Sequence, residues 1–124
     1  MRILIAEDEE ALRLLTARAL TDSGHEVVTA VDGADALEII TRDNGRFELL
    51  LTDIKMPLMD GIALALSVAR DHPKITILLM TAYADQRERA ANLDALIHDV
   101  ILKPFTLAEI KSAVADALAA RAKG

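Results

Sequence analysis

Polar side chains that could do chemistry follow four short apolar runs of this 124-residue chain. The most apolar of these runs contains three consecutive leucines and has the composition of a strand buried on both faces. Carboxylates brought close together raise one another's pKa values, and a hard divalent cation such as Mg²⁺ relieves their repulsion. A carboxylate beside that cation is a nucleophile able to accept a phosphoryl group. The side chains in question are Glu7, Asp8, Asp53, Thr81 and Lys103.

The residue types suggest a division of roles. Asp53 would accept the phosphoryl group, while Glu7 and Asp8 would hold or hydrate the cation. Thr81 would donate a hydrogen bond to a phosphoryl oxygen, and Lys103 would be its cationic partner. Each residue alone has a plainer explanation, such as a helix cap or an acidic first helical turn. Their joint occurrence behind apolar runs favours a common site.

These residues meet only if the elements before them form one parallel sheet. Apolar runs alternate with segments of helical periodicity five times, which predicts an α/β fold with a doubly wound parallel sheet and right-handed crossovers. The carboxyl ends of such strands line one edge, where open α/β sheets bind ligands. We expect strands over 3–6, 26–30, 48–53, 74–80 and 100–102, and helices over 11–20, 34–40, 62–70, 85–95 and 107–120.

The bulk composition limits the possible functions. The length predicts a single domain over residues 1–124. A net charge of −6 argues against direct binding of nucleic acid, and the absence of cysteine excludes disulfides and thiolate metal sites. No apolar run approaches the roughly 18 residues that cross a membrane, and no secretory leader is recognisable. We therefore expect a cytoplasmic protein without a membrane partner.

The three histidines lie apart from the acidic residues. His25 and His98 precede predicted strands, and His72 follows a predicted helix. These positions place them at the opposite edge of the sheet. We expect surface or capping roles for them, not metal binding or phosphorylation.

Four stretches of the sequence resemble the receiver domains of response regulators, the CheY-like superfamily. The resemblance covers essentially the whole chain and implies a flavodoxin-like (βα)5 fold with strand order 2-1-3-4-5. It implies a two-component phosphorelay, in which a sensor histidine kinase or a histidine phosphotransfer protein phosphorylates Asp53. The matching stretches are 3–9, 51–61, 80–83 and 102–105.

The same resemblance assigns a cofactor and individual roles. It implies that Mg²⁺ is bound by Asp8, Asp53 and the backbone carbonyl of Lys55, with Glu7 ordering a metal-bound water. Thr81 and Lys103 would bind the phosphoryl group, and the bond from this lysine to the following proline would be cis. The protein would not be an enzyme beyond its own phosphotransfer and autodephosphorylation. Its downstream target would bind the face made by the fourth helix, the fifth strand and the fifth helix.

Two departures from the family pattern concern the switch. Val100 stands where an aromatic ring is expected, so Tyr83 either replaces that ring or is an ordinary half-exposed loop tyrosine. Leu96 and Ile97 stand where a glycine usually ends the fourth helix. They indicate either tighter packing of that helix or a hydrophobic docking surface, and core packing is the favoured explanation. Because the chain stops after the last helix, we expect a stand-alone receiver. With valine in the switch position it also weakly resembles the CpdR type, an adaptor for regulated proteolysis.

Other functions on this architecture fit the sequence less well. A phosphatase of the haloacid dehalogenase type requires a second acid two residues after its nucleophile, where Lys55 stands. A flavin binder requires a polar phosphate loop after the first strand, where acids stand instead, and no Gly-x-x-x-x-Gly-Lys loop exists. A degenerate receiver, never phosphorylated and acting only as a protein-interaction module, is the remaining alternative.

Overall fold

The computed structural model of the chain describes residues 1–123 and contains one five-stranded parallel sheet in the order β2-β1-β3-β4-β5. This order confirms the flavodoxin-like fold predicted above. The strands are β1 (Arg2–Ala6), β2 (Glu26–Ala30), β3 (Leu49–Asp53), β4 (Thr76–Thr81) and β5 (Asp99–Leu102). The helices are α1 (Glu10–Asp22), α2 (Gly33–Arg42), α3 (Gly61–Asp71), α4 (Ala84–Ala91) and α5 (Leu107–Lys123).

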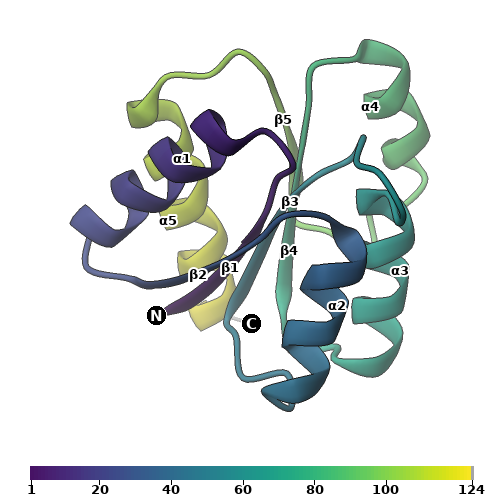
Figure 1. The fold of residues 1–124 in the computed structure, drawn as a ribbon, viewed down its shortest axis with the longest axis horizontal. Coiled ribbons are helices and arrows are strands. Elements are labelled where there is room, and N and C mark those ends of the chain that lie inside the picture. The colour runs from purple at the N-terminus through teal and green to yellow at the C-terminus, as the bar shows by residue number, and fades with distance from the viewer. Residues whose placement is uncertain (124) are drawn as a thin grey trace.

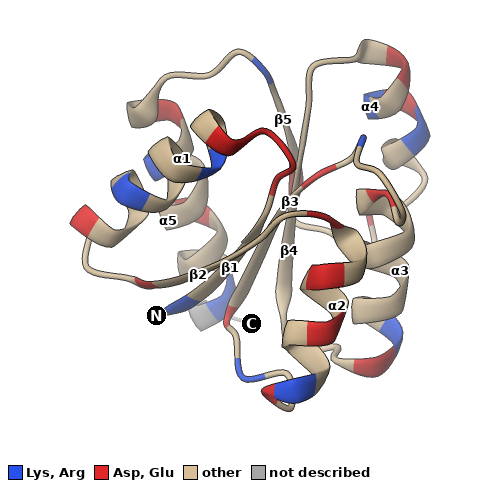
Figure 2. Cartoon of the chain, in the orientation of Figure 1, with Lys and Arg blue, Asp and Glu red and all other residues tan. Residues whose placement is uncertain are grey.

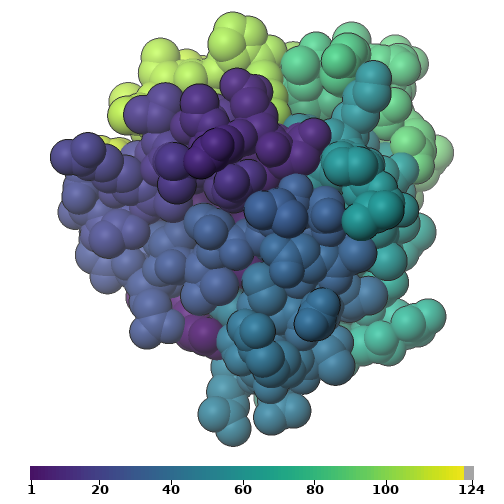
Figure 3. Space-filling view, viewed as in Figure 1, coloured from purple at the N-terminus to yellow at the C-terminus, as the bar shows by residue number. Residues whose placement is uncertain are grey.

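Helices cover both faces of the sheet (Figure 1), with α1 and α5 on one face and α2, α3 and α4 on the other. Each face therefore has its own core. Ile3, Leu51 and Leu78 point toward α1 and α5, whereas Leu50 and Leu79 point toward the other three helices. In the space-filling view (Figure 3), the purple start of the chain lies beside the yellow-green segment near its end.

Strand β3 is the centre of the sheet. All five of its residues are buried, and it pairs with β1 on one side and β4 on the other. Its alternating side chains enter both cores, which is why the sequence reads as a continuous apolar run instead of a two-residue alternation. The pairing ends at Asp53, which lies opposite Met80.

Two aspartates begin helices on the second face. Asp32 accepts a hydrogen bond from the Asp35 N–H at the start of α2, and Asp60 accepts one from the Ala63 N–H at the start of α3, both at 2.8 Å. Such side-chain caps satisfy backbone donors that the helix itself leaves free. They fix where the loops after β2 and β3 return to the sheet.

Helix α4 is shorter than predicted, since it ends at Ala91 instead of residue 95. Its only buried residue is Ala90, so little apolar contact holds the helix to the sheet. Residues 92–96 form turns, in which Leu96 donates its N–H to the Leu93 carbonyl. Ile97 is buried in the core as expected, but Leu96 is 45% exposed, so the core-packing prediction is wrong for that residue.

The amino ends of the strands carry a separate polar network. The Arg2 guanidinium binds Glu26 at 2.6 Å and Asp43 at 2.8 Å, and it lies 4.2 Å from the centre of the Phe47 ring. The three histidines lie on this side as well, because His25 precedes β2, His72 lies between α3 and β4, and His98 precedes β5. The backbone N–H of His98 donates to the Ile77 carbonyl. In the described part of the chain, no helix combines the length and apolarity that spanning a bilayer requires.

Candidate functional site

The end of β1 presents a buried carboxylate. The side chain of Glu7 is 1% exposed, and its Oε2 accepts the Glu9 N–H at 3.3 Å. Its backbone is held on both sides, because its N–H donates to the Ala30 carbonyl and its own carbonyl accepts the Arg13 guanidinium at 2.9 Å. Glu7 is therefore fixed by β2 and by the first turns of α1.

The end of β3 presents Asp53, which is 7% exposed. The loop that follows folds back on the strand, and the Gly61 N–H donates to the Ile54 carbonyl at 2.7 Å. A Cβ atom at position 61 would lie 2.0 Å from the Asp53 carbonyl oxygen, so only glycine fits there. The contact fixes the backbone that carries the Asp53 carboxylate.

Lys103 joins these two strand ends across the sheet. Its ammonium lies 2.5 Å from Glu7 Oε1 and 3.0 Å from Asp53 Oδ2, although the partners are 96 and 50 residues away in the chain. The bond between Lys103 and Pro104 is cis, as the family resemblance implies. One ammonium is thus shared by two buried carboxylates.

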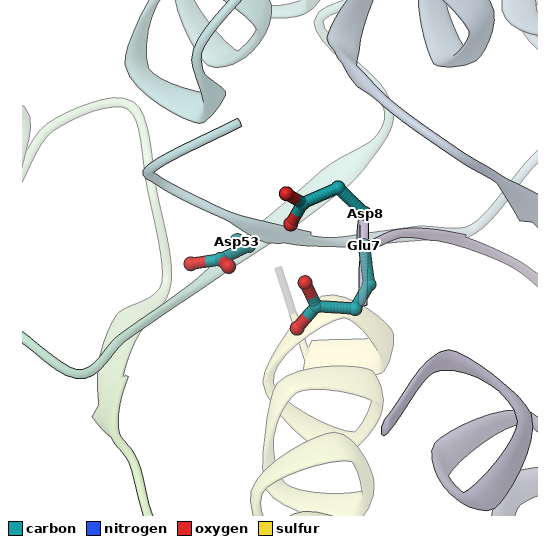
Figure 4. A group of neighbouring side chains, drawn as sticks. All are labelled: Glu7, Asp8 and Asp53. Carbon is teal, nitrogen blue, oxygen red and sulfur yellow. The ribbon is translucent and has the colours of Figure 1, made fainter. Parts of the chain in front are cut away.

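Asp8 completes a group of three carboxylates. Glu7, Asp8 and Asp53 each offer an oxygen, and these atoms lie within 4.8 Å of one another. Figure 4 shows the carboxylates of Glu7 and Asp8 turned toward that of Asp53, and Figure 2 shows the acidic positions where β1 and β3 end. An all-oxygen set that is open to solvent on one side fits Mg²⁺, which favours few carboxylates and keeps waters.

The charges of the site balance incompletely without a cation. Burial raises the pKa of Glu7 to about 7, and the nearby Asp53 charge adds to the rise, while Lys103 opposes it. Burial alone would lower the pKa of Lys103, but its hydrogen bonds to Glu7 and Asp53 outweigh burial and hold that pKa above its usual value. Three carboxylates facing one ammonium leave an excess of negative charge that a divalent cation can neutralise.

A cavity of about 350 Å³ opens over this group. Lys55 lines its outer side with an exposed side chain, whose ammonium lies 4.8 Å from the centre of the Tyr83 ring. Glu9 and Ala82 also line the cavity, and sequence reasoning assigned neither a role. Each directly follows a predicted residue, Asp8 or Thr81, so its position in the chain was the signal that could have identified it.

Thr81 is placed differently from the other predicted residues. It is fully buried at the end of β4, and its hydroxyl accepts the Tyr83 N–H at 3.1 Å. The cavity wall beside it is formed by Ala82 and Tyr83. The structure therefore gathers Glu7, Asp8, Asp53, Lys55 and Lys103 around one cavity and places Thr81 behind its wall.

The departures from the family pattern also have structural counterparts. Val100 is half-buried and packs against the core on the α4 side of the sheet. Tyr83 is 47% exposed and contacts Lys55 at the mouth of the cavity. An aromatic ring thus lies next to the site, on the loop after β4 instead of on β5.

Comparisons with known proteins agree with this geometry. The family described as the response regulator receiver domain matches residues 3–115. The response regulator MprA of Mycobacterium leprae is 38% identical over 110 residues, which are 89% of this chain and 47% of that protein. The chain spans about half the length of the curated relatives it matches.

Solved structures show the same likeness. A CheY-like receiver domain protein from Methanospirillum hungatei is 30% identical, with a TM-score of 0.89 over 98% of this chain and 96% of that one. The response regulator TrrA from Thermotoga maritima, solved in complex with Mg²⁺ and BeF, is 29% identical, with a TM-score of 0.82 over 94% of this chain and 97% of that one.

Proposed function

Because this chain belongs to the response regulator receiver domain family of two-component systems, we propose that Asp53 accepts a phosphoryl group from a phosphohistidine. The donor would be a sensor histidine kinase or a histidine phosphotransfer protein in the cytoplasm. The observation that carries this proposal is the placement of the Lys103 ammonium between the buried Glu7 and Asp53 carboxylates, beside the cavity.

The transfer is a displacement at phosphorus. A carboxylate oxygen of Asp53 forms the new bond to phosphorus while the bond from phosphorus to the donor imidazole nitrogen breaks. That nitrogen keeps the electron pair and then takes up a proton from solvent. The Lys103 ammonium, 3.0 Å from Asp53 Oδ2, lies close enough to stabilise the charge on the transferred group.

The acidic group fits the cofactor that such a transfer requires. Asp8, Asp53 and the backbone carbonyl of Lys55 would hold Mg²⁺, and Glu7 would order one of its waters. When bound, Mg²⁺ supplies positive charge to the phosphoryl oxygens and lowers the repulsion between donor and carboxylate. Water later hydrolyses the acyl phosphate and regenerates the Asp53 carboxylate. In this proposal the protein acts on no substrate other than its own aspartate.

Phosphorylation would alter the surface formed by α4, β5 and α5. It replaces the single negative charge of the Asp53 carboxylate with a phosphoryl group that carries about −1.5 to −2 charges, and Thr81 lies at the end of the neighbouring strand, ready to be drawn toward the new group. Helix α4 begins three residues after Thr81 and has only Ala90 buried, which supports its displacement. A downstream protein would read that change.

The alternative function is a receiver that is never phosphorylated and serves only as an interaction module. Val100 in place of an aromatic switch residue is the observation that favours it. The two functions differ in one measurable property, because only the first requires a covalent phosphoryl group on Asp53.

Acetyl phosphate with Mg²⁺ tests the proposal. Intact-mass spectrometry should show the addition of one phosphoryl group to the wild-type chain and none to Asp53→Ala. Asp22→Ala is the matched control, since Asp22 is an exposed acid at the end of α1. Equal labelling of Asp53→Ala and wild type would refute the assignment of Asp53. Absence of labelling from acetyl phosphate and from phosphorylated histidine donors would favour the interaction module.

Beryllofluoride provides a second, non-covalent test. In the presence of Mg²⁺ it should change the amide chemical shifts of residues 83–118 in the wild-type chain. Asp53→Ala should show no such change, because the aspartate oxygen that beryllium would bind is missing. Shifts confined to the cavity residues would refute the coupling to α4, β5 and α5 while leaving phosphorylation itself intact.

A further inference from the structure

Strand β5 is an open edge of the sheet. It pairs with β4 alone, so one side of its backbone has no neighbouring strand. A free edge of this kind can pair with another extended chain through its N–H and C=O groups. The opposite edge strand, β2, pairs with β1 alone and also has one free side, but there Glu26 is neutralised by Arg2 at 2.6 Å.

A hollow flanks β5 on each face of the sheet. The hollow beside α4 has a volume of about 300 Å³ and a floor that includes Ile97 and Val100. The hollow beside α5 has a volume of about 370 Å³ and a floor that includes Leu78 and Ile101. Because side chains of a strand alternate between faces, an added strand would direct its side chains into both hollows in turn.

The rims of both hollows are acidic. Arg87, at the α4 side, is the one lysine or arginine among the residues that line either hollow, and His98 lines both. Among the described residues, the rim carboxylates form no ion pair, so their charge is available to a partner. These carboxylates are Asp94, Asp99, Glu109 and Asp116.

We propose that the free edge of β5 binds an extended partner segment rich in lysine and arginine. The aliphatic stems of such residues would cover the apolar floors, and their charged heads would reach the acidic rims. Backbone pairing with β5 would supply the remaining affinity. The use of this edge as the output surface rests on the proposed function, whereas binding of the segment does not.

A short capped peptide of repeating Arg-Arg-Val-Val units is the probe, because this order places arginines on both faces of an added strand, and a peptide of repeating Glu-Glu-Val-Val units of the same length is its counterpart. The basic peptide should shift the amide resonances of residues 97–102 and slow their hydrogen exchange, and the acidic peptide should do neither. Affinity should fall as salt is added, because exposed ion pairs are screened. Binding that leaves the exchange of β5 amides unchanged would overturn strand pairing.

Two double variants that each remove two negative charges distinguish the effect of the rim carboxylates on binding from the effect of the overall net charge of −6. Asp99→Asn with Asp116→Asn should weaken binding about fivefold, as expected for the loss of two exposed ion pairs. Asp22→Asn with Glu38→Gln, which alters exposed acids on α1 and α2, should leave it unchanged. Equal weakening by both would overturn the proposal, as would equal binding of both peptides.

The same titration in Asp53→Ala distinguishes this inference from the proposed function. The variant cannot be phosphorylated, yet its β5 edge is intact, so it should bind the basic peptide as the unphosphorylated wild type does. Loss of binding in this variant would overturn the inference. Failure of both acetyl phosphate and phosphorylated histidine donors to label the wild type would overturn the proposed function and leave the peptide result as it stands.

Discussion

The carboxylate of Asp60 contacts two helices, so its removal should weaken the attachment of both. Its Oδ1 accepts the Ala63 N–H at 2.8 Å and caps α3, while its Oδ2 accepts the Arg89 guanidinium of α4 at 2.9 Å. Asp60→Ala removes both interactions. Asp60→Asn keeps an equivalent cap and removes only the ion pair, since asparagine and aspartate are comparable at the N-cap.

The two losses have different sizes. Replacement of a capping side chain by alanine costs about 0.5–2 kcal/mol. The side chains of Asp60 and Arg89 are 31% and 49% exposed, so their ion pair is worth only about 0.2–1 kcal/mol. We expect Asp60→Ala to lower the free energy of unfolding by about 1–3 kcal/mol, and Asp60→Asn and Arg89→Ala to lower it by less than about 1 kcal/mol each.

The pH dependence gives an independent signature. Burial disfavours the charge on Asp60, but the Ala63 N–H and Arg89 outweigh burial and hold the pKa of Asp60 below its usual value of 3.8. A carboxylate with a lowered folded-state pKa stabilises the protein above its unfolded-state pKa and loses that contribution as the pH falls through the folded-state value. The stability difference between wild type and Asp60→Asn should therefore be constant near neutral pH and shrink in acid below 3.8.

Urea denaturation of the single variants and of Asp60→Asn with Arg89→Ala forms a double-mutant cycle. The cycle should return a favourable coupling energy of the ion-pair size. Arg87→Ala is the matched control, because it removes an exposed arginine of the same helix that makes no ion pair among the described residues. The reasoning fails if Asp60→Ala costs no more than Asp60→Asn, or if Arg87→Ala couples to Asp60 as strongly as Arg89→Ala does.

Three further predictions concern the site and its loop. Lys103→Met leaves the buried Glu7 and Asp53 carboxylates without their ammonium partner. Urea denaturation in chelator should therefore show a free energy of unfolding lower by about 3 kcal/mol, and Mg²⁺ should restore part of it. Equal losses with and without Mg²⁺ would contradict this prediction. Because the pKa of Glu7 is raised from 4.5 to about 7, the free energy of unfolding of the wild type in chelator should fall as the pH rises between these values. Glu7→Gln should remove this pH dependence, and an identical pH dependence in both proteins would refute the explanation. Leu58 is 87% exposed with φ of 68°, so Leu58→Gly should relieve backbone strain and leave stability unchanged or raised by up to about 1 kcal/mol, whereas a clear loss in thermal denaturation would refute the strain.

The sequence carries most of the information about the fold because the sheet is parallel and buried. The apolar run from Leu49 to Asp53 predicts a strand in the centre of the sheet. The alternation of strands and helices predicts that the carboxyl ends of all strands lie at one edge of the sheet. The same logic predicts that Glu7, Asp53 and Lys103 converge, and their ion pairs have that arrangement. Strand order followed from the family resemblance, since periodicity alone does not say which strands are neighbours.

What escaped prediction depends on long-range contacts. The length of α4 was overestimated because its polar sequence has helical propensity, whereas its end is set by how little of it the sheet buries. The ion pair of Asp60 with Arg89 spans 29 residues and has no local signature. The retreat of Thr81 behind Ala82 and Tyr83 depends on the course of one loop, which residue types do not specify.

The Arg2 network lies at the amino ends of the strands, far from the cavity at their carboxyl ends. It ties β1 to β2 through Glu26 and to the end of α2 through Asp43, and none of these groups touches the acidic site. The Arg2 ion pairs and the acidic cavity thus lie at opposite ends of the strands. A substitution among the Arg2 contacts therefore changes no residue that lines the cavity.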